Sequence, residues 1–204
     1  MKSWLALVCA AAALFGARSA DAADWSPFSP VPMVVDPADR FEVRFGAFAH
    51  GVGSVEQGTV DINGELVSPR LSFGMVTGPW AFLIPRLHAG GSWNTSNRTS
   101  FVYTGALWTI PVWDRMFVEA YVGPAAHNGS LTVTPQLAGL GCDTLFHAGA
   151  SVGYRFDDHW SVLGTFEHLS NGKTLFGIDC GTNQAATGSN QGLNNYGLRV
   201  GYAF

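Results

Sequence analysis

The chain has 204 residues and a formal net charge of −4, and only 13% of its residues are charged, whereas 47% are hydrophobic and 13% aromatic. An acidic balance gives no basis for nucleic-acid binding. Beyond the N-terminal region, no segment is long and apolar enough to span a membrane as a helix. A composition rich in glycine and aromatics but poor in charge is more typical of strands in lipid than of a soluble helical domain.

Residues 1–22 have the layout of a secretory signal peptide. Lys2 precedes an apolar run from Trp4 to Phe15, and small residues lead to Ala22, after which we expect cleavage. An uncleaved anchor is the alternative, but the run is shorter than the roughly 20 residues that a spanning helix needs. We therefore expect a cleaved signal peptide at 1–22, a Pro-rich lead at 23–39 and one domain at 40–204.

From residue 41 onward, apolar and polar residues alternate with the period that is typical of β-strands. Val43 and Phe45 share one face of the first strand, and Glu42 and Arg44 share the other. The pattern predicts further strands near 59–73, 80–93, 101–113, 116–122, 146–156, 160–170 and 196–204. Short connections near 77–79, 113–115 and 157–159 alternate with longer loops near 51–58, 93–100, 127–143 and 172–192. Short turns at one end and long loops at the other are typical of outer-membrane barrels.

The predicted fold is all-β: an eight-stranded antiparallel transmembrane β-barrel of the outer-membrane type. A soluble sandwich or a lipocalin-like barrel would also alternate, but in the later strands the bulky apolar face is continuous and the charges lie opposite it. The charged residues expected to fill the lumen as pairs are Arg44, Glu65, Arg86, Glu119, Arg155, Glu167 and Arg199. Because side chains fill the lumen of eight strands, no pore is expected.

Two cysteines remain after Cys9 leaves with the signal peptide, and Cys142 and Cys180 both fall in long loops on the extracellular side. An even pair in an exported, oxidising setting predicts a disulfide. Metal binding is the alternative, but no Cys or His ligand spacing surrounds them. The sequence predicts neither a metal site nor a cofactor, and we expect His50, His88, His127, His147 and His159 to be lumen, turn or loop residues.

His168 and Ser170 are two residues apart on the predicted seventh strand, so both side chains project from one face. That face also carries Trp160 and Phe166 and therefore points toward lipid. The alternative interpretation is that His168 and Ser170 are interfacial residues at a strand end, in contact with sugars or water. The last strand pairs with the seventh, and Asn190, Asn194 and Tyr196 have the same parity as its lipid-facing set, so a nucleophile, a base and amide groups can meet on one external patch.

The segments Phe166-Glu167-His168-Leu169-Ser170-Asn171 and Asn190-Gln191-Gly192-Leu193-Asn194-Asn195-Tyr196-Gly197 resemble the PagL-type lipid A 3-O-deacylases, which are eight-stranded outer-membrane esterases. The resemblance implies Ser170 as nucleophile, His168 as general base, and Asn171 and Asn190 as oxyanion donors. It also implies lipid A, or lipopolysaccharide of the outer leaflet, as partner and the bacterial outer membrane as location. Whether the barrel forms a homodimer is left open.

The sequence departs from the family at the acid, because Asn194 occupies the position of the glutamate that orients the histidine. An amide oxygen can accept a hydrogen bond from a catalytic imidazole, but it does not stabilise an imidazolium as a carboxylate does. Glu167 is expected to face the lumen, and Asp179 could reach His168 only from an ordered loop. Two hypotheses therefore stand: an outer-membrane serine esterase that removes an ester-linked acyl chain from lipid A, and a non-catalytic barrel with a structural or loop-display role.

Overall fold

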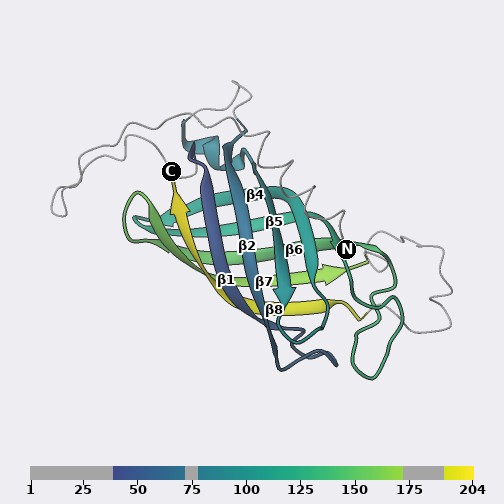
Figure 1. The fold of residues 1–204 in the computed structure, drawn as a ribbon. Coiled ribbons are helices and arrows are strands. Elements are labelled where there is room, and N and C mark those ends of the chain that lie inside the picture. The colour runs from purple at the N-terminus through teal and green to yellow at the C-terminus, as the bar shows by residue number, and fades with distance from the viewer. Residues whose placement is uncertain (1–38, 72–77, 172–190) are drawn as a thin grey trace.

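The computed structural model describes residues 39–71, 78–171 and 191–204. The predicted signal peptide, Asp179, Cys180 and Asn190 lie outside the described residues. Eight strands pair in chain order into a closed antiparallel barrel (Figure 1), which confirms the predicted fold class. The strands are β1 (Glu42–His50), β2 (Thr59–Arg70), β3 (Arg86–Asn94), β4 (Phe101–Trp113), β5 (Met116–His127), β6 (Thr144–Arg155), β7 (Trp160–Ser170) and β8 (Leu193–Ala203).

Alternation along the strands places charges in the lumen and apolar side chains outside. Arg44 is 1% exposed, whereas its neighbour Phe45 is 66% exposed. Within the lumen, the Arg44 guanidinium lies 2.8 Å from Glu42 and 2.7 Å from Glu119. An apolar exterior around an ionic interior is the reverse of a soluble barrel and suits a barrel surrounded by lipid.

The third strand begins later than the sequence pattern predicts. Residues Gly78–Leu83 form a short 3-10 helix, η2, and β3 starts at Arg86 instead of near residue 80. Pro85 has no N–H to donate to a strand ladder, which favours a break before β3. The indole of Trp108 on β4 donates a hydrogen bond of 3.1 Å to the Leu83 carbonyl and holds η2 against the barrel wall. No helix in the described ranges is long and apolar enough to cross a membrane.

The described long loops gather at one end of the barrel. Loops 51–58, 95–100 and 128–143 lie at the end where β7 finishes, and η2 and the C-terminus lie at the opposite end (Figure 1). β7 pairs with β8 in a register that sets His168 opposite Asn194 and Phe166 opposite Tyr196. The barrel therefore brings the candidate residues together at its long-loop end.

Candidate active site on the outer barrel surface

His168, Ser170 and Asn194 project from the outer face of β7 and β8. The flanking residues Glu167, Leu169 and Asn195 are 0% exposed and face inward, whereas the three candidates are half-buried on the outside. Directly below them, the rings of Phe166 and Tyr196 contact each other with centroids 4.9 Å apart. A hydroxyl, an imidazole and an amide thus form a small polar patch above an aromatic surface that faces lipid.

One side of the His168 ring is held by Asn194. Nδ1 of His168 lies 2.7 Å from Oδ1 of Asn194, across the β7–β8 pair. An amide oxygen only accepts hydrogen bonds, so Nδ1 is the donor and carries the proton. In a neutral imidazole this leaves Nε2 as the acceptor, which is the tautomer that a general base requires.

Ser170 is the last residue of β7 and pairs with Phe146 of β6, while His168 pairs with Ala148. Within the described part of the chain, no hydrogen bond joins Ser170 Oγ to His168. Catalytic hydrogen bonds often shorten only when substrate is bound, so the shared face and the spacing of two residues remain the relevant geometry.

The other edge of the His168 ring faces the backbone of Gly192, which has a φ of +60°. A Cβ at Gly192 would lie 2.8 Å from the Leu169 carbonyl oxygen and 3.0 Å from Cε1 of His168. Glycine is therefore required twice over, by the backbone conformation and by the close approach to the imidazole. The resemblance included Gly192 in a motif but assigned it no role.

We predict that Gly192→Ala lowers acyl-ester hydrolysis, the activity that the family resemblance implies, about 10- to 100-fold, because the added methyl pushes the imidazole away from its position beside Ser170. Gly53→Ala is the matched control, since Gly53 has a φ of +84° but a Cβ there meets nothing within 4 Å. The rate of acyl-ester hydrolysis by both purified variants in detergent tests this. Equal rates for Gly192→Ala and the wild type would show that the contact is irrelevant.

Other predicted site residues occupy different places. Glu167 points into the lumen, 3.3 Å from both Nε2 of His147 and the Arg199 guanidinium, so it is separated from His168 by the barrel wall. Asn171 is 1% exposed, and its Nδ2 donates to the Leu140 carbonyl at 3.2 Å. Asn190 and Asp179 lie outside the described residues.

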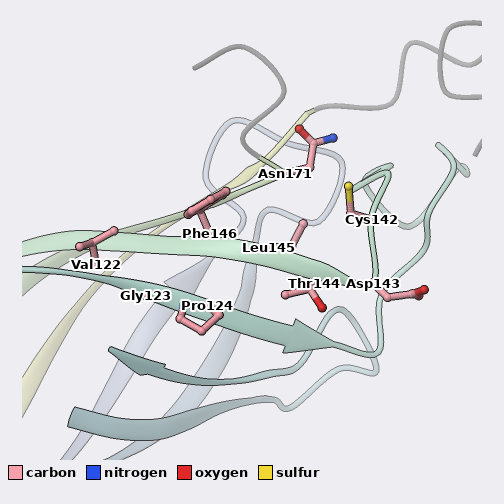
Figure 2. A pocket seen from close by; sticks show the side chains of 9 residues that line it. All are labelled: Val122, Gly123, Pro124, Cys142, Asp143, Thr144, Leu145, Phe146 and Asn171. Carbon is pink, nitrogen blue, oxygen red and sulfur yellow. The ribbon is translucent and has the colours of Figure 1, made fainter. Parts of the chain in front are cut away.

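A hollow of about 480 Å³ opens on the outer surface of β5 and β6 beside the patch (Figure 2). Phe146 links the two, because it lines the hollow and is the cross-strand partner of Ser170. Val122 and Pro124 line it from β5, whereas Asp143 and Asn171 lie at the loop end. The lining is mostly apolar, so the hollow suits a hydrocarbon chain that lies along the barrel wall.

The remaining histidines occupy lumen, loop and turn positions. His50 and His88 lie in the lumen beside Asp61 and Glu65, at 2.8 Å in each case. His127 contacts the Cys142 carbonyl, and His159 contacts the Ala203 carbonyl. Among the described residues, no cluster of three or more His, Cys, Asp or Glu could hold a metal ion. Cys142 is disulfide-bonded, and Cys180, its predicted partner, lies outside the described residues.

The barrel is similar to solved structures of bacterial outer-membrane barrels. The crystal structure of the outer membrane enzyme PagL superposes with a TM-score of 0.57 at 17% identity, over 78% of this chain and 97% of that chain. The N-terminal β-barrel domain of OprF from Pseudomonas aeruginosa superposes with a TM-score of 0.50 at 12% identity, over 81% of this chain and 98% of that chain. At these identities, the similarities show the fold alone. No curated protein sequence gives a significant match.

Fold and site together define an eight-stranded outer-membrane barrel with a serine, a histidine and an asparagine on its outer surface. The family model described as lipid A 3-O-deacylase (PagL) matches residues 70–203. The chain therefore belongs to the PagL family of lipid A 3-O-deacylases, and the resemblance seen in the sequence is confirmed. The predicted outer-membrane location and lipid A deacylase function agree with this membership.

Proposed function

We propose that this protein is an outer-membrane serine esterase in which Ser170, His168 and Asn194 remove an ester-linked acyl chain from lipid A. The observation that carries the proposal is the 2.7 Å contact between His168 Nδ1 and Asn194 Oδ1 on the lipid-facing surface, next to Ser170. Acyl esters of the outer leaflet are the substrate class that such a surface meets.

In the proposed reaction, His168 Nε2 takes the proton of Ser170 Oγ as the oxygen attacks the ester carbonyl carbon. The resulting tetrahedral oxyanion collapses, the bond to the sugar oxygen breaks, and that oxygen receives the proton from His168. Water, activated by the same imidazole, then hydrolyses the acyl-Ser170 intermediate and releases a fatty acid. Asn171 and Asn190 are the proposed oxyanion donors, and in the structure the Asn171 side chain donates to the Leu140 carbonyl at 3.2 Å.

Asn194 supplies the hydrogen bond that selects the tautomer of His168 but no negative charge. In the intermediate step the imidazole carries a proton on each nitrogen, and a neutral amide stabilises this cation less than a carboxylate would. We therefore expect a slow esterase. The presence of Asn194 in place of a carboxylate also motivates the alternative of a non-catalytic barrel with a structural or loop-display role. The experiment must therefore distinguish an esterase from a non-catalytic barrel.

The test is mass spectrometry of lipid A from cells that express the protein. The esterase predicts loss of one hydroxy-acyl chain from lipid A with the wild type. The non-catalytic barrel predicts unchanged lipid A although heat-dependent gel mobility shows an inserted, folded barrel. The latter result would overturn the proposed function.

We propose that the acyl chain binds in the apolar hollow beside Ser170. Val122→Trp should fill part of it and reduce kcat/KM for lipid A about tenfold, in the range that a crowded apolar pocket costs. Val152→Trp is the control, because Val152 is 56% exposed on the same outer surface but does not line the hollow. Both are measured as hydrolysis rates on lipid A in detergent. Equal losses in the two variants would show that the hollow does not bind the chain.

A further inference from the structure

Loop 51–58 buries one carboxylate, that of Glu56, at the centre of the described loops. Glu56 is 0% exposed. Its Oε2 accepts from the Thr99 backbone N–H at 2.8 Å, and its Oε1 accepts from the Thr99 hydroxyl at 2.9 Å and from the Ala138 N–H at 2.8 Å. Nε2 of His50 lies 3.1 Å from Oε2. One side chain thus connects loop 51–58 to the two following long loops and to the end of β1.

Residues 138–140 of loop 128–143, which Glu56 holds through the Ala138 N–H, also contact the chain on both sides of the candidate site. Next to Ala138, the Gly139 carbonyl accepts from the Gln191 N–H at 3.2 Å. The Leu140 carbonyl accepts from Asn171 Nδ2 at 3.2 Å. Asn171 follows Ser170 directly, and Gln191 precedes Gly192, which packs on the His168 ring. Movement of this segment would therefore shift the surroundings of both Ser170 and His168.

Loop 51–58 reaches the third member of the site directly. The Val52 N–H donates to the Asn194 carbonyl at 2.8 Å, and the Gly51 N–H donates to Oδ1 of Asn195 at 2.8 Å. The loop that carries Glu56 thus continues the pairing of β8 at the residue whose side chain orients His168.

We propose that Glu56 is a positioning residue of the esterase: it locks three loops together and thereby holds Ser170, His168 and Asn194 in register. This inference rests on the proposed function. Glu56 touches neither the substrate nor the reacting atoms, and it acts through Ala138–Leu140 on one side and through Val52 on the other.

The buried, hydrogen-bonded carboxylate of Glu56 suits a residue that joins loops better than one that makes an exposed contact. A buried carboxylate is retained at low cost only when several donors satisfy its oxygens, as they do here. Burial by itself would raise the pKa of Glu56, but the hydrogen bonds from His50, Thr99 and Ala138 outweigh it and hold the pKa below its ordinary value. Removal of the carboxylate leaves those donors buried and unpaired, which favours opening of the loops.

The test compares Glu56→Ala and Glu56→Gln with Val55→Ala, a control at an exposed side chain of the same loop. Because a small misplacement can cost about 100-fold, we expect Glu56→Ala to lower kcat for lipid A by about that factor with KM unchanged. Glu56→Gln keeps one acceptor oxygen but turns an NH₂ group toward the donors, so its kcat should lie between those of Glu56→Ala and the wild type. Val55→Ala should behave as the wild type.

Amide hydrogen exchange in detergent supplies a readout that is independent of activity. Protection of the Gln191 and Val52 amides should fall about tenfold in Glu56→Ala, as expected for the loss of roughly one hydrogen bond, while amides in mid-strand keep theirs. Unchanged protection at both amides, or an unchanged kcat, would overturn the inference. An inactive wild-type protein would instead contradict the proposed function. The exchange rates of the Gln191 and Val52 amides would still show whether Glu56 holds the segments on either side of the site.

Discussion

The Ser170→Ala variant should lose acyl-ester hydrolysis by about 10³-fold or more, because in serine hydrolases removal of the nucleophile leaves only the contribution of binding and oxyanion stabilisation. Lipid A from cells that express this variant should keep its full set of acyl chains. The barrel should still assemble, since Ser170 is half-buried at the end of β7 and its side chain faces outward. Mass spectrometry of lipid A and the hydrolysis rate in detergent measure the effect.

Ser161→Ala is the matched control for Ser170→Ala. Ser161 lies on the same strand but faces the lumen, where its hydroxyl donates to Glu42 at 3.3 Å. Its replacement should leave hydrolysis intact. Retained activity in Ser170→Ala would show that Ser170 is not the nucleophile. An equal loss of hydrolysis in both variants would indicate that the substitutions disturb the barrel.

A carboxylate at position 194 should raise the rate of hydrolysis. Aspartate has the shape of asparagine, so Asn194→Asp places an anionic oxygen where Oδ1 now lies, 2.7 Å from His168 Nδ1. In the proposed mechanism, the charge stabilises the imidazolium that forms as Ser170 loses its proton. The exchange of acid for amide in a serine protease cost about 10⁴-fold, which bounds the gain, and we expect at least about tenfold.

The gain at position 194 is measured as kcat on lipid A, for Asn194→Asp and for Asn194→Glu, which introduces the residue type that the resemblance implies at this position. The same substitutions in a Ser170→Ala background are the control and should produce no activity. A rate equal to or below that of the wild type in both carboxylate variants would show that Asn194 does not act on His168 during catalysis.

The period of two along the chain, together with the alternation of short turns and long loops, predicted the barrel and its inside-out character. Successive side chains on a strand point to opposite faces, so Arg44 beside Phe45 already separates lumen from lipid. The same parity by itself assigns His168, Ser170 and Asn194 to the outer face. These are local properties of a strand, and local sequence encodes them. The start of β3 was predicted too early because residues 80–84 form an apolar run that can also belong to a strand, whereas the 3-10 helix η2 occupies most of it and Pro85 precedes the strand.

Contacts between distant segments were decided by the tertiary structure alone. The family resemblance implied that Asn194 lies beside His168, but their contact joins residues 26 positions apart, and only the register in which β7 meets β8 fixes it at 2.7 Å. Glu56 finds its partners in Thr99 and Ala138, which follow it by 43 and 82 residues. No periodicity marks such hydrogen bonds, because closure of the barrel, not the local chain, brings the loops together. The sequence by itself thus determined the faces and the candidate chemistry, and the closed barrel decided which side chains hold that chemistry in place.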